Sequence, residues 1–250
     1  MLTKKIVVCL DIKNGSVVKG VNFININEVG NPVEFAKRYE QEGADELVLL
    51  DIAATSQNRK ALLKLISEVS KELTVPFTVG GGIHSVESAQ EVIDAGADKI
   101  SVGSAAIKNP TLIRELSSKL GEDKVVLAID CKLDNNEWLV YTQGGKKATQ
   151  LRALEWAVRG EELGAGSILL TSMNNDGAKS GFAIDITKTI ADTVNIPVIA
   201  SGGAGTQDHF LDLFQQTKAI GGLAASVFHY NEINIGELKA YLRKNEVEIK

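Results

Sequence analysis

The second half of this 250-residue sequence repeats the first, and this repeat constrains the fold more than any other feature. The segment VPFTVGGGI in the first half returns as IPVIASGGAG in the second. Nearly the same spacing that separates Gly81 from Gly202 also separates Asp11 from Asp130. Each half therefore carries one aspartate after a hydrophobic segment and one glycine-rich turn, which predicts two superposable half-domains.

Eight short hydrophobic segments alternate with amphipathic ones along the chain, and their continuous hydrophobicity predicts parallel strands buried on both faces. The predicted strands are 5–11, 46–51, 76–80, 99–103, 124–130, 167–171, 197–201 and 219–224. The predicted helices are 32–43, 58–73, 85–95, 110–120, 151–163, 185–194, 206–216 and 236–245. This alternation is typical of an α/β fold of the (β/α)8 barrel type. We expect one domain over 1–250, built from half-barrels of about 1–122 and 123–250.

Two connections, 12–31 and 131–150, are long, and each follows one of the two aspartates. Asn31 and Asn109 each precede a proline, a pattern that predicts an asparagine N-cap before a helix that starts with proline.

The composition excludes several classes of protein. The net charge of −5 comes without a basic block, which argues against a nucleic-acid-binding surface. No apolar stretch reaches the ~20 residues that a membrane span needs, and the first residues lack the pattern of a signal peptide. We therefore expect a cytoplasmic protein that binds neither nucleic acid nor membrane.

The sequence gives no sign of a bound cofactor. Cys9 and Cys131 cannot form a secreted-type disulfide framework, and we expect both to be buried free thiols. The three histidines show no metal-ligand spacing, and no GxGxxG follows the first strand. We expect no metal site and no dinucleotide cofactor.

Asp11 and Asp130 end two strands half a chain apart, so a barrel would hold them on opposite sides of its active face. Two carboxylates across a substrate can act as general acid and general base when their environments separate their pKa values. One strand-end aspartate often caps a turn instead. Two at matching positions of a repeat favour catalysis.

Each half also contains two small-residue turns that can receive a phosphate. Backbone N–H groups at such turns attract anions, and small residues allow a close approach. The first pair of turns contains Gly82 and Gly103-Ser104; the second contains Ser201, Gly202, Gly203, Ala204, Ala225 and Ser226. A ligand with a phosphate at both ends would fit such a site.

Further polar residues follow the predicted strands or lie in the long connections. Lys19 in the first long connection is placed to neutralise a phosphate. The others, which suit contacts to substrate hydroxyl and imidazole groups, are Asp51, Thr171, Ser201, and Asp176 with its neighbour Gly177.

The motifs CLDIKNGSVVKGVNF, ADELVLLDIAAT, PFTVGGGI, VVLAIDCK, ILLTSMNNDGAKSG, PVIASGGAG and LAASVFH together resemble the cyclase subunit of imidazole glycerol phosphate synthase, the HisF family. The resemblance covers essentially the whole chain. It implies a duplicated barrel that acts in histidine biosynthesis on the phosphoribulosyl-formimino aminoimidazole carboxamide ribonucleotide, which carries two phosphates. Ammonia from a partner glutaminase of the HisH type would enter at the N-terminal face and attack the ribulosyl carbonyl. Imidazole glycerol phosphate and the aminoimidazole carboxamide ribonucleotide would then be released.

By the same resemblance, Asp11 and Asp130 match the acid–base pair and Lys19 matches a loop lysine. The resemblance also implies a charged ring around the ammonia entrance, of which Lys5, Glu46 and Lys99 are present. The chain departs from the family pattern at a few positions. Gly103, Asn174 and Ala178 replace the usual Asn, Asp and Thr, and Ser167 replaces an acid of the ring.

Three alternatives stay open from sequence. The sister isomerase of histidine biosynthesis, HisA, is also a duplicated barrel with two aspartates, but KGVNF and AIDCK favour the cyclase. A paralogue that amidates a sugar would not need two phosphate sites. A catalytically silent barrel that binds phosphate ligands or the glutaminase would not need both aspartates.

Overall fold

The computed structural model describes residues 3–21, 24–53 and 59–250, without the side chains of 19–27. Eight parallel strands close into a barrel, because β10 pairs with β11 on one side and with β7 on the other. Their bounds are β1 Lys5–Lys13, β4 Glu46–Asp51, β5 Phe77–Gly80, β6 Lys99–Val102, β7 Val125–Asp134, β10 Ser167–Ser172, β11 Val198–Ser201 and β12 Gly221–Ala224. The prediction of a (β/α)8 barrel is confirmed.

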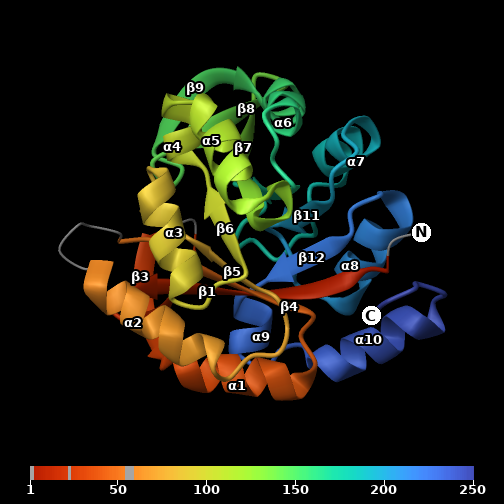
Figure 1. The fold of residues 1–250 in the computed structure, drawn as a ribbon. Coiled ribbons are helices and arrows are strands. Elements are labelled where there is room, and N and C mark those ends of the chain that lie inside the picture. The colour runs from red at the N-terminus through yellow and green to blue at the C-terminus, as the bar shows by residue number, and fades with distance from the viewer. Residues whose placement is uncertain (1–2, 22–23, 54–58) are drawn as a thin grey trace.

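The helices surround the strands (Figure 1). Their bounds are α1 Pro32–Glu42, α2 Arg59–Ser70, α3 Val86–Asp94, α4 Ser104–Lys108, α5 Thr111–Leu120, α6 Ala153–Glu162, α7 Ile184–Thr193, α8 Gln207–Gln216, α9 Ser226–His229 and α10 Ile235–Lys244. A short 3-10 helix, Glu122–Lys124, precedes β7. The short helices α4 and α9 were not predicted, because a single turn of helix is too short to show the 3.6-residue hydrophobic period.

The two asparagine caps have different outcomes. The Asn31 side chain accepts hydrogen bonds from the N–H groups of Val33 and Glu34, as predicted for the start of α1. The prediction for Asn109 is wrong: it ends α4, and Pro110 occupies the position before α5. The Asn109 side chain instead accepts from the hydroxyl group of Thr111 (2.8 Å).

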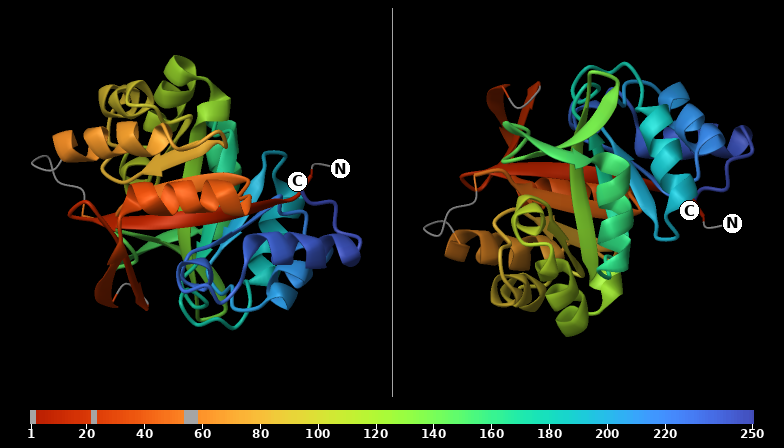
Figure 2. Two further views of the ribbon diagram at one scale, coloured as in Figure 1. Left: turned by 90° about the horizontal axis from the view of Figure 1, so that it is seen from below. Right: turned by 90° about the horizontal axis from the view of Figure 1, so that it is seen from above.

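Both long connections fold into β-hairpins that extend a barrel strand. The first contains β2 (Ser16–Val21) and β3 (Ile24–Gly30), with β2 antiparallel to β1. The second contains β8 (Glu137–Thr142) and β9 (Lys147–Arg152), with β8 antiparallel to β7. Both hairpins lie on the side of the barrel away from the chain ends (Figure 2). An antiparallel hairpin therefore follows the first strand of each half, β1 and β7.

The alternation along β1 divides the core into two layers. Ile6, Val8 and Leu10 point outward and pack beneath the helices in the main hydrophobic cluster. Val7 and Cys9 point inward and belong to a second cluster that fills the barrel. Continuing this two-residue period places Lys5 at the N-terminal end of the interior and Asp11 at its C-terminal end. Cys9 and Cys131 are both buried thiols, as predicted.

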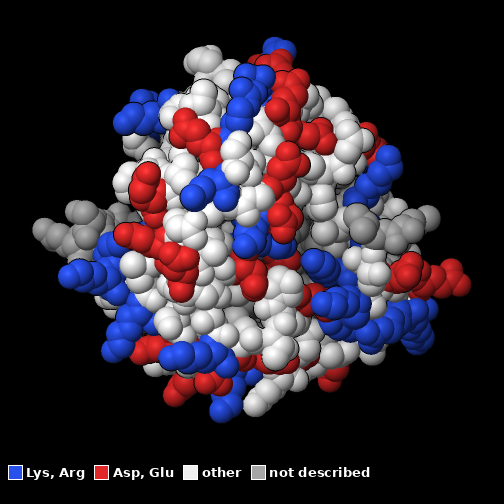
Figure 3. All heavy atoms as spheres, in the orientation of Figure 1, with Lys and Arg blue, Asp and Glu red and all other residues white. Residues whose placement is uncertain are grey.

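The two chain ends meet at the N-terminal end of the barrel. The N–H of Lys4 donates to Glu248 O (2.8 Å), and the N–H of Lys250 donates to Lys4 O (3.0 Å). Acidic and basic side chains both spread over the face seen in Figure 3. Among the described residues, no helix is long and apolar enough to cross a membrane.

Candidate active site

A cavity of about 610 Å³ lies at the C-terminal ends of the barrel strands, the end that carries active sites in folds of this class. It is lined by residues from each strand or from the turn directly after it. The predicted site residues among them are Asp11, Asp51, Gly82, Gly103, Ser104, Asp130, Thr171, Asp176, Gly177, Ser201, Gly202, Gly203, Ala204, Ala225 and Ser226. The backbone of Lys19 lies in β2, and its side chain is outside the described part of the chain.

Asp11 and Asp130 face the cavity from opposite sides of the barrel. Asp11 lies on β1 and Asp130 on β7, and three barrel strands separate these two in either direction around the ring. The Cys9 Sγ lies 3.7 Å from Asp11 Oδ1 and donates to it. A ligand placed between the two aspartates would therefore meet one carboxyl group on each face.

The pKa of Asp130 is raised to about 6, first by its withdrawal from bulk water and then by the negative charges of Asp176 and Asp11. The side chain keeps partial contact with the cavity, so a ligand can reach it. A carboxyl group with a pKa near neutrality can both donate and accept a proton at physiological pH. Burial also raises the pKa of Asp51, although the N–H of Ala53 donates to its Oδ1 (2.9 Å) and acts in the opposite direction.

The glycine-rich turns after β5 and β11 approach neighbouring main chain so closely that side chains cannot fit. Gly81 has φ +98°, and a Cβ there would lie 2.2 Å from Asp51 O. Gly202, its counterpart in the second half, has φ +91°, and a Cβ would lie 2.6 Å from Ser172 O. At Gly203, which has φ +105°, a Cβ would lie 1.9 Å from Gly181 O. Glycine is required at these positions for both space and backbone conformation.

The residues after each glycine turn are fixed in the same way in the two halves. The N–H groups of His84 and Ser85 donate to Ser88 Oγ at 3.1 and 3.0 Å. The N–H groups of Gly205 and Thr206 donate to His209 Nδ1 at 3.0 and 3.2 Å. In each half a side chain from the first turn of the following helix thus orders the end of the loop that lines the cavity. The role of His209 was not predicted, since the usual capping-box residue at this position is Glu or Gln.

The second turn of each pair starts a short helix. Gly103 precedes α4, and a Cβ on it would lie 3.3 Å from Ala128 O. Ala225 precedes α9 and is buried. Thus Gly82 with Gly103-Ser104, and Gly203-Ala204 with Ala225-Ser226, form two pairs of adjacent turns at the cavity wall, which we call the first and second cup.

The loop after β10 is tied to the second cup by hydrogen bonds. Asn175 Nδ2 donates to Gly181 O (2.8 Å), and the N–H of Gly181 donates to Gly203 O (2.8 Å). Asn174 Oδ1 accepts from the N–H of Leu133 (2.8 Å), which connects this loop to the extension of β7. These contacts fix the loop that carries Asp176 and Gly177 into the cavity.

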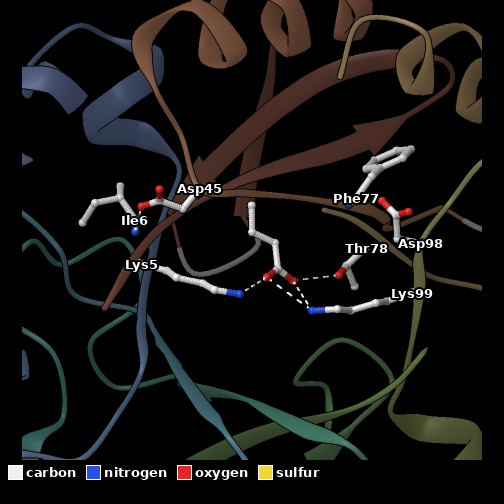
Figure 4. A network of polar contacts seen from close by, with 8 residues as sticks. Lys5, Ile6, Asp45, Phe77, Thr78, Asp98 and Lys99 are labelled. Atoms are coloured by element: carbon white, nitrogen blue, oxygen red, sulfur yellow. Dashed lines mark hydrogen bonds and ion pairs between the residues drawn. The ribbon is translucent and has the colours of Figure 1, made fainter. Parts of the chain in front are cut away.

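A buried ionic cluster occupies the opposite, N-terminal end of the barrel interior (Figure 4). Glu46, whose side chain is 1% exposed, accepts from Lys5 at 3.3 Å and from Lys99 at 3.2 Å. Thr78 Oγ1 donates to Glu46 Oε1 (3.0 Å). The structure thus brings together the three ring residues that the resemblance implied. Ser167 is buried at the start of β10, and no hydrogen bond recorded for the described residues joins it to the cluster.

The inward-facing apolar cluster separates this ionic cluster from the cavity. Its members are Val7, Cys9, Val48, Val126, Leu169, Ile199, Leu223 and Ala225. Along the inner face of β1 the order from the N-terminal end is therefore polar at Lys5, apolar at Val7 and Cys9, and polar at Asp11. A charged solute would lose its hydration in crossing the middle layer, whereas a small neutral one would lose much less.

Comparison with known proteins agrees with this arrangement. A family model described as "Histidine biosynthesis protein" matches residues 5–234. A protein of Pyrococcus furiosus called imidazole glycerol phosphate synthase subunit HisF is 54% identical over 250 residues, covering 100% of this chain and 99% of the relative. The HisF subunit of Flavobacterium johnsoniae is 53% identical over the full length of both chains, and that of Geobacillus thermodenitrificans is 48% identical over the same share. The chain belongs to the HisF family.

HisF carries the cyclase function in histidine biosynthesis, so this chain is an enzyme of the lyase class that catalyses a cyclisation. The relatives are named as subunits, which makes the HisF chain one part of a multi-subunit enzyme. Among the described residues, no group of three or more His, Cys, Asp or Glu side chains could hold a metal ion.

Several residues that line the HisF cavity were missed from sequence. The turn between β8 and β9 contributes Gln143, Gly144 and Lys146, and the first half contributes His84 and Ser101. His84 Nδ1 lies 2.8 Å from Gly82 O, where it donates to the first cup's main chain. The signal for the turn was the QGGKK segment, whose adjacent glycines mark a tight turn between two extended segments.

Proposed function

We propose that this HisF chain uses ammonia to convert the phosphoribulosyl-formimino aminoimidazole carboxamide ribonucleotide into imidazole glycerol phosphate and the aminoimidazole carboxamide ribonucleotide. The observation that carries the proposal is the placement of Asp11 and Asp130 on opposite strands of one cavity that also holds both cups. A substrate with a phosphate at each end would be held at its ends with its reacting centre between the two carboxyl groups.

The cups bind the phosphates through the backbone N–H groups of their turns and the hydroxyl groups of Ser104 and Ser226. Lys19 adds a positive charge from β2. Holding both ends restricts the reacting centre to a productive geometry. In favourable cases such positioning lowers the activation free energy by about 7–11 kcal/mol. The ribose and imidazole parts of the substrate, between the two cups, are contacted by Asp51, Thr171, Asp176, Gly177 and Ser201. Gly202 belongs to the glycine-rich turn of the second cup.

Asp11 and Asp130 transfer the protons. Attack of ammonia on the ribulosyl carbonyl requires a proton to reach the carbonyl oxygen and another to leave the nitrogen before water departs. Later cleavage and ring closure again need one donor and one acceptor. The raised pKa of Asp130 suits a group that must change its protonation state during this cycle.

Ammonia reaches the cavity from the N-terminal end, where a glutaminase subunit of the HisH type binds to form a heterodimer. Lys5, Glu46 and Lys99 surround the entrance, and the apolar cluster that follows favours neutral ammonia over ammonium. Support for a partner comes from the relatives, which are named as subunits. The ring has one acid for two lysines, because Ser167 is uncharged.

We also propose that the chain is a single domain derived from two half-barrels of about 1–122 and 123–250. Support comes from the matching hairpins after β1 and β7 and from the matching contacts of Gly81 and Gly202. The two halves meet at the β6–β7 and β12–β1 pairings, so each half alone would have two unpaired strand edges.

We expect ammonium-driven turnover, measured at a fixed concentration of free ammonia, to show a limb with its midpoint near pH 6 from Asp130. Replacing Asp176 by asparagine removes a negative charge that raises the pKa of Asp130, so the midpoint should move to lower pH. The direction of the limb identifies the role. A base loses activity as the pH falls through the midpoint, and an acid loses activity as it rises.

Asp51→Asn is the matched control, because Asp51 is also a cavity aspartate but is not among the charges that act on Asp130. The midpoint of its pH profile should be the same as that of the unmodified chain. An unchanged midpoint in Asp176→Asn would show that the limb does not belong to Asp130.

A further inference from the structure

The turn between β8 and β9 is seated on the first cup. Thr142 and Lys147 are the last paired residues of the hairpin, and residues 143–146 connect them. The N–H of Gln143 donates to Ser104 Oγ at 2.9 Å. This hydrogen bond holds the turn against the helix that completes the first cup.

The backbone of the turn is shaped by three consecutive residues in the left-handed region. Gln143, Gly144 and Gly145 have φ +59°, +61° and +78°. On its other side the turn packs on Met173, since a Cβ on Gly145 would lie 2.6 Å from Met173 Cε. The turn is therefore fixed between the first cup and the loop after β10, and Lys146 is delivered to the cavity wall.

The negative charges around the cavity would repel a phosphate ligand unless a cation lies nearby. Four carboxylates line it, from Asp11, Asp51, Asp130 and Asp176. Across the described side chains of its lining, Lys146 is the only lysine or arginine. A ligand with two phosphates would bring further negative charge next to these carboxylates, and backbone N–H groups carry only partial positive charge. A lysine at the wall offsets this repulsion directly.

We propose that Lys146 binds the phosphate held by the first cup, an inference that rests on the proposed function of the cups. The lysine donates from the β8–β9 turn to the phosphate oxygens that face away from Gly82 and Gly103. In this chain Gly103 offers no side-chain donor, so the first cup depends on backbone N–H groups, Ser104 and this lysine.

Most exposed lysines have no such role, and the adjacent Lys147, the first residue of β9, provides the comparison. Both lysines are exposed, but Lys147 lies in β9 opposite Thr142 and does not line the cavity. The two residues share charge and neighbourhood, so a general electrostatic effect would follow from losing either one. Binding of the phosphate would follow only from Lys146.

The test is the affinity of the intact chain for its substrate, measured by calorimetry without ammonia so that no turnover occurs. Lys146→Ala should bind about tenfold more weakly, the effect of losing one hydrogen bond to a charged group. Lys146→Arg should stay within about threefold of the unmodified chain, because it keeps the charge and the donor. Lys147→Ala should bind like the unmodified chain.

The two products identify the cup, since each carries one phosphate. Ser104→Asp places a carboxylate in the first cup and Ser226→Asp in the second, so each should weaken a different product. Lys146→Ala should weaken the same product as Ser104→Asp and leave the other unchanged. Equal weakening of both products by Lys146→Ala would overturn the assignment to the first cup.

Different results would contradict the role of Lys146 and the phosphate-binding role of the first cup. If Ser104→Asp weakens binding and Lys146→Ala does not, the cup stands and the role of Lys146 is wrong. If Ser104→Asp also leaves the affinity for both products unchanged, the first cup itself is not a phosphate site, and both proposals fall.

Discussion

Replacing Asp130 by asparagine is expected to lower kcat by about 10²–10⁴-fold, the usual contribution of a positioned acid or base. Asparagine has nearly the shape of aspartate but cannot exchange a proton in this pKa range. The affinity for the substrate should stay within a few-fold, because the cups that hold the phosphates are unchanged. Ammonium-driven turnover gives the rate, and calorimetry without ammonia gives the affinity.

Unfolding of the Asp130→Asn variant should not account for its lower kcat. The pKa of Asp130 is higher in the folded chain than the ordinary value, so ionised Asp130 destabilises the fold above pH 6. Asparagine removes that cost, and the variant should be at least as resistant to urea as the unmodified chain at pH 8. Asp11→Asn should lose turnover similarly, whereas Asp51→Asn should lose much less. Near-full activity of either Asp11→Asn or Asp130→Asn would contradict the acid–base assignment.

Replacing Glu46 by glutamine is expected to lower the free energy of unfolding by about 2 kcal/mol. Removing one partner of a buried ion pair typically costs about 3–5 kcal/mol, because the other charge stays uncompensated. The lysine side chains here are 24% exposed and can turn partly toward water, so the cost should be smaller. Equilibrium unfolding in urea measures the difference.

The matched control replaces the three charged residues of the cluster with apolar ones, as Lys5→Met, Glu46→Leu and Lys99→Met together. Such replacements of buried ion clusters are often neutral or stabilising. The triple variant should therefore recover most of the stability that Glu46→Gln loses. If Glu46→Gln unfolds at the same urea concentration as the unmodified chain, the cluster does not stabilise this end of the barrel.

The barrel and much of the cavity could be predicted because both follow from strand periodicity. Once β1 is placed in a barrel, the alternation that turns Val7 and Cys9 inward also places Lys5 at one end and Asp11 at the other. The repeat then places Asp130 opposite Asp11. Strand ends and glycine turns are local features, so the sequence is enough to locate them.

The hairpins and short helices could not be placed by the same reasoning. The residues of β8 and β9 alternate only weakly, and β9 is largely exposed, so its hydrophobic signal is small. The contact of Gln143 with Ser104 joins segments from different barrel strands, and such a pairing depends on how the closed barrel positions them. Thr78 in the ionic cluster and His209 at the second loop were missed for the same reason.

The most direct test of the proposed cyclase is conversion of the bisphosphorylated ribonucleotide by the purified chain with ammonium salt at high pH, in the absence of a glutaminase. We predict loss of substrate with release of imidazole glycerol phosphate and the aminoimidazole carboxamide ribonucleotide in equal amounts. Tight binding of the substrate without either product would contradict the account and leave a barrel that binds phosphates but does not catalyse.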